Sequence, residues 1–269
     1  MPLLHLVILA IIQGVTEFLP ISSSGHLVLI PATTGWDDQG AIMDVAVHVG
    51  TLGAVLLYFR HDVGRLFNGA WQIATRRHSA ETRLVWYVVV ATVPLVIFGL
   101  VLHQTGAYDS LRSAKVIAWS MFGFGILLYA ADRLGRFDMS MEAMSARHAV
   151  LIGLAQALAL IPGTSRSGIC ITAARWLGFN RTEAARFAML LSIPAIAAAG
   201  TLATLEIAES GDTALTGDAL LAAAIAFVTA LGAIALMMRW LENASYLPFV
   251  IYRLAFGGIL LVWAHGWLG

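Results

Sequence analysis

The segment Gln13–His26, with the sequence QGVTEFLPISSSGH, interrupts an otherwise apolar region with polar residues, a proline and glycines. A second segment, Pro162–Gly168 (PGTSRSG), does the same further along the chain. The two segments separate short apolar runs, at about 3 to 12 and 25 to 33, and at about 149 to 160 and 168 to 178. These runs are too short to cross a bilayer, which takes roughly 20 residues of helix. Because non-helical backbone at membrane depth must be buried in protein or face water, each segment predicts a re-entrant helix-loop-helix hairpin.

The composition places the rest of the chain in a membrane. Of its 269 residues, 59% are hydrophobic and 12% are charged, whereas soluble proteins carry about 25% charged residues. We therefore expect an all-α polytopic membrane protein with a single integral membrane domain over residues 1–269. Six apolar runs are long enough to be full transmembrane helices, at about 41 to 60, 84 to 103, 114 to 131, 184 to 205, 217 to 238 and 247 to 267.

Charge and cysteine content exclude several classes of partner. Lys and Arg number 16, as do Asp and Glu, so the chain has no net charge with which to attract nucleic acid. Cys170 is the only cysteine, which excludes disulfides, cysteine-based zinc sites and iron–sulfur clusters within one chain. The first apolar run resembles a signal peptide in length, but no Lys or Arg precedes it, so we expect it to belong to the fold.

The distribution of basic residues predicts the orientation. No Lys or Arg occurs before Arg60, and the connection from Arg60 to Arg83 contains five arginines. The positive-inside rule puts this connection in the cytoplasm and both termini outside. The two hairpins then enter from opposite sides, the first from outside and the second from the cytoplasm, which predicts inverted repeats at about 1–135 and 145–269. Four positions recur 143 residues later, namely Gln13, Ser22, Ser24 and Gly25 as Gln156, Ser165, Ser167 and Gly168.

Side chains of the first segment form a candidate catalytic set. Gln13 and Glu17 are four residues apart and share a helix face, and a carboxylate within a membrane is usually paired or functional. Three serines and a histidine follow, which supply a nucleophile, an acid, a base and a metal ligand: Ser22, Ser23, Ser24 and His26. Alternatively, the serines cap the next helix and backbone N–H groups satisfy Glu17.

The second segment predicts an anion site. A helix N-terminus offers free N–H groups and Arg166 offers a planar set of donors, and both match phosphate oxygens. Arg166 needs an anionic partner at this depth, either a substrate phosphate or Glu17 in a structural ion pair. Together the two segments favour phosphate-ester chemistry on a lipid-borne substrate. Glu17, His26 and phosphate oxygens are also suitable ligands for Mg²⁺ or Ca²⁺.

Both segments closely resemble the two signature motifs of the undecaprenyl-diphosphate phosphatase family, also called bacitracin-resistance proteins. The resemblance covers the whole chain, including the stretch Pro248-Phe-Val-Ile-Tyr252-Arg253. It implies an enzyme of the bacterial inner membrane that removes one phosphate from undecaprenyl diphosphate. This reaction recycles the lipid carrier for cell-wall synthesis and confers resistance to bacitracin. The resemblance also implies a divalent cation, Mg²⁺ or Ca²⁺, and the orientation above predicts a site that opens toward the periplasm.

Matched residue by residue, the family motifs imply four catalytic residues. Ser23 is the nucleophile, Glu17 its base or a metal ligand, His26 an acid–base group and Arg166 the phosphate clamp. Two alternatives make His26 the nucleophile, or have Ser23 and His26 position a water molecule. Gln13 stands where many members have Glu, which leaves Glu17 as the only carboxylate of the motif. The resemblance implies supporting contacts to substrate or metal from Gln13, Ser22, Ser24, Thr164, Ser165 and Ser167.

Other intramembrane polar residues have two interpretations each. Asp44 and His48 share a helix face, where they either line the entrance of the site or form a pair between helices. Arg253 and Tyr252 either hold the two halves together or contact a phosphate. The expected partners are a polyprenyl diphosphate and membrane lipids, and the sequence leaves a homodimer open. A transporter or lipid flippase is the main alternative function, because inverted repeats with broken helices are typical of transporters.

Overall fold

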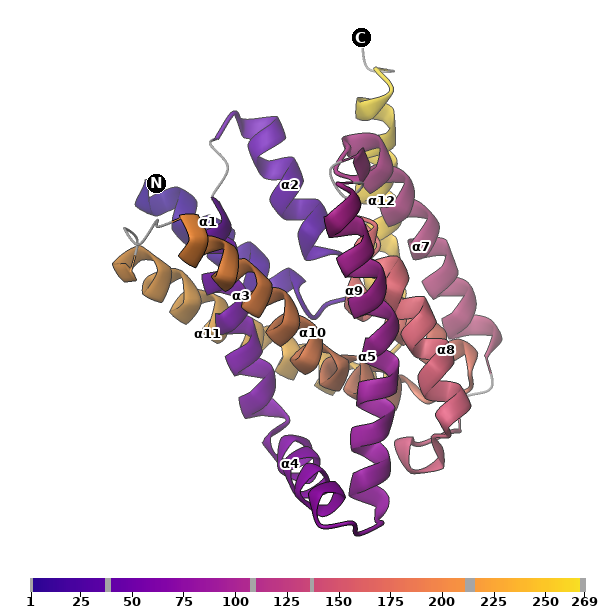
Figure 1. The fold of residues 1–269 in the computed structure, drawn as a ribbon. Helices are drawn as coiled ribbons and strands as arrows, with labels where there is room; N and C mark the ends of the chain where they lie inside the picture. The colour runs from indigo at the N-terminus through magenta and orange to yellow at the C-terminus, as the bar shows by residue number, and fades with distance from the viewer. Residues whose placement is uncertain (1, 37–39, 107–109, 136–137, 211–215, 267–269) are drawn as a thin grey trace.

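The computed structural model describes residues 2–36, 40–106, 110–135, 138–210 and 216–266. In these residues the regular elements are helices, apart from one isolated bridge between Met139 and Phe179. The α-helices are α1 (Leu3–Thr16), α2 (Ser23–Thr34), α3 (Gly40–Tyr58), α4 (Arg60–Ala74), α5 (Ala80–Thr105), α7 (Ala114–Leu134), α8 (Ala146–Ala157), α9 (Arg166–Trp176), α10 (Arg181–Ser210), α11 (Thr216–Leu241) and α12 (Leu247–Ala264). Two short 3₁₀ helices are η1 (Met141–Ala143) and η2 (Leu158–Leu160). The predicted all-helical fold is confirmed (Figure 1).

Five of these helices are long and apolar enough to cross a membrane: α5, α7, α10, α11 and α12. Each contains most of a run that the sequence predicts as a span, although residue 267, the end of the last run, lies outside the described residues. The predicted span at 41 to 60 corresponds to α3, which bends by 88° into α4. The two together form a sixth candidate span. The chain is therefore a multi-pass membrane protein.

Local sequence explains where several helices begin and end. Ser79 and Ser145 each accept a hydrogen bond from the backbone N–H three residues ahead, and each forms a complete capping box. Ser113 caps α7 in the same way by accepting from Val116. Gly106 ends α5 with a left-handed conformation, φ 66°, which glycine adopts without steric cost.

The helices pack in pairs through small residues (Figure 1). α1 packs on α11 and α8 packs on α5, while α3 packs on both α10 and α11. At Gly50 a Cβ atom would lie 2.1 Å from the Ala223 carbonyl oxygen, and at Gly153 it would lie 2.7 Å from the Ala91 backbone. Helix axes can approach this closely only where a side chain is absent, as is common between membrane helices. The Gly50 contact thus brings α3 close to α11, and the Gly153 contact holds the short helix α8 against α5.

The short helix α9 lies among α7, α8 and α10, and its first turn carries Arg166 (Figure 1). The chain after α1 approaches this turn, because Ser167 Oγ donates a 3.1 Å hydrogen bond to the Leu19 carbonyl. Phe18 is fully buried in the main apolar core beside Ile169 and Cys170. The fold thus brings the two polar segments together inside the helical assembly.

Candidate functional site

The first polar segment ends in a strained turn that starts α2. Ser22 has φ 77°, in the left-handed region that a residue with a Cβ atom seldom adopts. Its hydroxyl accepts a hydrogen bond of 3.3 Å from the Gly25 N–H and lies 3.3 Å from the Ser24 hydroxyl. Ser22 therefore caps α2, as the capping alternative for the serines predicts.

The second segment repeats this turn 143 residues later. Ser165 has φ 70°, and its hydroxyl accepts a 3.1 Å hydrogen bond from the Gly168 N–H. The Ser165 and Ser167 hydroxyls are also 3.1 Å apart. The sequence matches at this offset thus correspond to one backbone geometry that occurs twice. Each turn places the N-terminus of a helix at a break, a position where an anion is favourably bound.

Glu17 lies at the centre of the polar contacts. Its Oε2 accepts hydrogen bonds from Ser23 Oγ at 2.8 Å and from Gln13 Nε2 at 2.9 Å. Its Oε1 accepts one from Arg166 Nη2 at 3.1 Å. The Glu17 side chain is 8% exposed and that of Arg166 is 13% exposed, so the charges neutralise each other away from bulk water. The structure thus unites Gln13, Glu17, Ser23 and Arg166, and it contains the ion pair that the sequence leaves as an alternative.

The contact between Ser23 and Glu17 has the geometry of a nucleophile and its base. A hydroxyl that donates to a carboxylate can pass on its proton when its oxygen attacks an electrophile. The Ser23 side chain is partly exposed, whereas Glu17 is buried. Ser23 is therefore the more accessible member of this pair.

The predicted residue His26 occupies a neighbouring position with different partners. Its Nδ1 lies 2.6 Å from the Ser22 carbonyl oxygen, which can only accept, so Nδ1 carries a proton. Its Nε2 lies 2.5 Å from the Tyr252 hydroxyl, and its ring stacks on Phe256 at 5.1 Å between centroids. The first turn of α2 is thereby bound to α12.

Arg253 has a structural place that the sequence leaves undecided. Its buried guanidinium donates to four backbone carbonyls, those of Ser120, Met121, Pro20 and Gly163. Pro20 and Gly163 lie in the two polar segments, also 143 residues apart. Arg253 therefore holds both breaks together, as one of its two predicted interpretations states.

His48 joins the site from α3, although it is not among the residues that the motifs single out. Its Nδ1 lies 2.7 Å from the Asp44 carbonyl oxygen, which orients the ring. Its Nε2 lies 3.8 Å from Glu17 Oε2. Its spacing from Asp44 is the signal in the sequence, but the contact with Glu17 depends on the packing of α3 against α1.

Three buried side-chain atoms have no hydrogen-bond partner in the described residues: Gln13 Oε1 and Thr164 Oγ1 in the two polar segments, and Gln156 Oε1 on α8. A buried polar atom without a hydrogen bond is costly, and at a binding site it indicates a ligand. An amide oxygen beside a carboxylate fits a hard cation such as Mg²⁺ or Ca²⁺, which prefers oxygen ligands. Among the described residues, no three His, Cys, Asp or Glu side chains cluster as a complete protein metal site.

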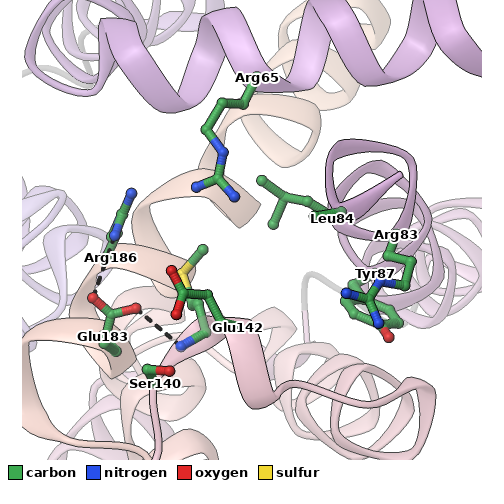
Figure 2. A pocket seen from close by; sticks show the side chains of 10 residues that line it. Arg65, Arg83, Leu84, Tyr87, Ser140, Glu142, Glu183 and Arg186 are labelled. Carbon is green, nitrogen blue, oxygen red and sulfur yellow. Dashed lines mark hydrogen bonds and ion pairs between the residues drawn. The ribbon is translucent and has the colours of Figure 1, made fainter. Parts of the chain in front are cut away.

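A separate cavity of about 140 Å³ lies between α4, α5, η1 and α10 (Figure 2). Glu183 accepts a hydrogen bond from Arg186, as Figure 2 shows, and another from the Met141 N–H. Arg186 also forms an ion pair with the buried Asp62. None of the predicted site residues lines this cavity, which is lined by Arg65, Ala80, Arg83, Leu84, Tyr87, Ser140, Met141, Glu142, Glu183 and Arg186. We interpret this ion-pair network as a structural link between α4 and α10.

The fold and the site define a multi-pass, all-helical membrane protein with a buried cluster of carboxylate, hydroxyl and guanidinium groups. Residues 6–259 match the family model described as bacitracin resistance protein BacA, and the chain belongs to this family. A protein of Jannaschia sp. (strain CCS1) named undecaprenyl-diphosphatase is 52% identical over 266 residues, covering 98% of this chain and 100% of its own. Undecaprenyl-diphosphatases of Ruegeria sp. (strain TM1040) and Hahella chejuensis are 53% and 50% identical, covering 99% and 97% of this chain and 100% and 98% of their own.

Proposed function

We propose that this chain hydrolyses undecaprenyl diphosphate to undecaprenyl phosphate and inorganic phosphate, at a site formed by the two polar breaks. The names of its relatives support the substrate and the reaction. The observation that carries the proposal is the chain of contacts from Ser23 to Glu17 to Arg166. Removing the diphosphate deprives bacitracin of its target, in agreement with the description of the family.

In the proposed reaction the Ser23 oxygen attacks the terminal phosphorus of the diphosphate. The Ser23 proton passes to Glu17 Oε2, a phosphorus–oxygen bond forms at serine, and the bond to the bridging oxygen breaks. Undecaprenyl phosphate leaves. Water then attacks the phosphorus of the phosphoserine, so that a phosphorus–oxygen bond to water forms and the bond to Ser23 breaks. Glu17 returns its proton to the serine oxygen, and the protons of the water stay on the inorganic phosphate that is released.

Arg166 and the breaks supply the electrostatic part of the mechanism. Hydrogen-bond donors that are already in position before the reaction stabilise the charge on the equatorial phosphate oxygens. They do so effectively because no free energy is spent on reorienting them as the charge develops. Arg166 neutralises the buried Glu17 in the absence of substrate, and the guanidinium N–H groups outside this ion pair bind the phosphate. Thr164 supplies its unpartnered hydroxyl to the same phosphate. Ser22, Ser24, Ser165 and Ser167 shape the two turns and present the N–H groups of α2 and α9.

A divalent cation, Mg²⁺ or Ca²⁺, fits beside Glu17 and Gln13 Oε1, with the remaining ligands from substrate and water. Such an ion offsets phosphate charge. His26 is an acid–base group beside the site, where its Nε2 lies 2.5 Å from the Tyr252 hydroxyl. Its Nδ1 lies 2.6 Å from the carbonyl oxygen of Ser22, the residue that precedes the proposed nucleophile Ser23.

The same proposal includes the membrane arrangement. Six helices cross the inner membrane, namely α3, α5, α7, α10, α11 and α12, and α1 with α2 and α8 with α9 form oppositely oriented re-entrant hairpins. The repeated turns at Ser22 and Ser165 support inverted repeats, as does the packing of α1 on α11 and of α8 on α5. Both termini and the site face the periplasm. An impermeant thiol reagent should modify Ser24→Cys from that side, and modification only from the cytoplasm would refute this orientation.

Phosphate release tests the function. The purified protein in detergent, supplied with undecaprenyl diphosphate and Mg²⁺ or Ca²⁺, should release inorganic phosphate, and a chelator should stop the release. Glu17→Gln, with its fold checked by thermal unfolding, should lose at least about 100-fold in kcat/KM because the base is gone. If the wild-type protein releases no phosphate but moves labelled lipid between the leaflets of vesicles, the transporter function is correct instead.

A further inference from the structure

Helix α4 follows α3 after a bend of 88° and lies at one end of the helical assembly (Figure 1). α3 alone is long enough to cross the bilayer, since its 19 residues extend over about 28 Å and the hydrocarbon core is about 30 Å thick. The bend then directs α4 along the membrane plane instead of across it.

Two contacts fix the side of α4 that packs on the protein. The buried Asp62 forms an ion pair with Arg186 of α10. At Gly69 a Cβ atom would lie 2.5 Å from the Glu81 carbonyl oxygen, so α4 lies directly against the first turn of α5. Because α4 is held at both positions, the other sides of the helix have a defined direction.

The side of α4 away from these contacts carries two exposed aromatic rings. Phe67 is 74% exposed and Trp71 is 69% exposed, and their spacing of four residues places them on one helix face. Asn68 and Gln72, also four residues apart, lie between this aromatic face and the packed face of Gly69. A helix with a packed, an aromatic and a polar face is suited to the boundary between lipid and water.

Two exposed arginines follow directly after the aromatic face. α4 ends in a turn in which the Arg77 N–H donates a 2.8 Å hydrogen bond to the Gln72 carbonyl. Arg76 has φ 57° in this turn, at the position where glycine is usual, so the helix ends at a steric cost with a charged side chain. Near a membrane surface, each basic side chain raises the local concentration of anionic lipid about fivefold.

We propose that α4 is a surface helix that binds anionic phospholipids, with Phe67 and Trp71 in the boundary of the hydrocarbon and Arg76 and Arg77 on lipid phosphates. The occupant is lipid because the positive charges complement anionic headgroups and because tryptophan is enriched at membrane interfaces. In the proposed orientation these lipids belong to the cytoplasmic leaflet. The inference is independent of the proposed reaction.

The fluorophore NBD, attached to single introduced cysteines, tests the position of the helix. Phe67→Cys reports on the aromatic face, and Asn68→Cys is the matched control on the adjacent polar face, since both side chains are exposed. The native Cys170 is buried and should not react. The protein is reconstituted in vesicles of phosphatidylcholine and phosphatidylglycerol. Lipids with a nitroxide on the acyl chain should quench NBD at Phe67→Cys, whereas aqueous iodide should quench it at Asn68→Cys.

Two results would overturn this placement. If iodide quenches both positions equally and nitroxide lipids quench neither, α4 lies in water. If NBD at Phe67→Cys is protected from both quenchers, a second copy of the chain or another protein segment covers the aromatic face. The lipids occupy both leaflets, so these results do not depend on the proposed orientation, which the accessibility of Ser24→Cys tests separately.

Lipid selectivity is measured in the same vesicles by placing the nitroxide either on phosphatidylglycerol or on an equal amount of phosphatidylcholine. At Phe67→Cys the phosphatidylglycerol nitroxide should quench at least about twofold more strongly, because the neighbouring arginines concentrate this lipid. Val228 is 66% exposed in the middle of α11, away from Arg239 at the end of this helix. At Val228→Cys the two nitroxide lipids should quench equally.

The arginines are tested by Arg76→Gly combined with Arg77→Gln. This variant should fold, because glycine relieves the strain at φ 57°, and it should lose the preference for phosphatidylglycerol at Phe67→Cys. Arg147→Gln combined with Arg239→Gln removes the same charge from two exposed positions on α8 and α11 and should keep the preference. An undiminished preference in the first variant, or an equal loss in both, would overturn the assignment of lipid binding to the end of α4.

Discussion

Arg166 Nη2 lies 3.1 Å from Glu17 Oε1, although 149 residues separate the two along the chain. The pair joins the two polar segments and places a phosphate clamp beside the base. Because Arg166 also donates to the Ala188 carbonyl, its guanidinium is oriented from two directions. A lysine keeps the charge but not this planar set of donors.

Arg166→Lys should therefore reduce kcat/KM for a prenyl diphosphate about 100-fold, a typical effect of losing one oriented donor to a reacting group. Thermal unfolding of the same preparation should change little, since lysine still neutralises Glu17. If kcat/KM of this variant equals that of the wild type, the reaction depends on the charge of Arg166 and not on its planar set of donors.

Ser23 and Ser24 are adjacent serines with different contacts. Ser23 donates to Glu17, whereas the Ser24 hydroxyl lies beside that of Ser22. Ser23→Ala should lower kcat at least about 10³-fold, as expected for loss of a nucleophile that acts with its base. Ser24→Ala should lower it less than about tenfold. Comparable losses in both variants would show that the serines share a binding role and that neither is the nucleophile.

The left-handed turn at Ser165 predicts an unusual order of stabilities. Alanine removes the hydrogen bond that caps α9 and keeps the strain of a Cβ atom at φ 70°, so Ser165→Ala should lower the free energy of unfolding by about 1 kcal/mol. Glycine removes the same cap but relieves the strain, and Ser165→Gly should cost only a few tenths of a kcal/mol, or about zero. Thermal unfolding in one detergent measures both, and a glycine variant less stable than the alanine variant would contradict the account.

The buried guanidinium of Arg253 should be a major determinant of stability. Arg253→Met leaves four backbone carbonyls without this donor and should lower the free energy of unfolding by about 3 kcal/mol. Arg239 is exposed on α11, so Arg239→Met removes the same charge as a control and should leave Tm within about 2 °C. Equal Tm values for the two variants would show that Arg253 does not hold the breaks together.

Much of the fold follows from the sequence because membrane helices are determined by the length and polarity of apolar runs. Four predicted runs fall within α5, α7, α10 and α11, and most of a fifth coincides with α12, while the polar segments fall at the breaks before α2 and α9. The sequence did not indicate that α4 belongs to a candidate membrane span, because charged residues such as Asp62 and Arg65 lie there among the apolar ones. The bend of 88° before it lies at Phe59, where the sequence has neither a proline nor a glycine to indicate it.

The candidate site, like the fold, could be predicted only in part from the sequence. Glu17, Ser23 and Arg166 could be selected from the sequence, because charged or reactive residues in apolar surroundings are conspicuous. The contact of His48 with Glu17 and the four carbonyl partners of Arg253 could not, since both depend on how distant helices meet. The capping roles of Ser22 and Ser165 required the backbone angles that only the structure supplies.

A double-mutant cycle tests the central claim that both breaks form one hydrolytic site. It compares phosphate release from undecaprenyl diphosphate by wild-type protein, Ser23→Ala, Arg166→Ala and the double variant, all checked for folding by thermal unfolding. Groups that act as a unit in one transition state give strongly non-additive losses. We predict that both single variants lose nearly all kcat/KM. The kcat/KM of the double variant should be no lower than that of the less active single variant. Near wild-type release by either folded single variant, or losses that multiply in the double variant, would contradict the account.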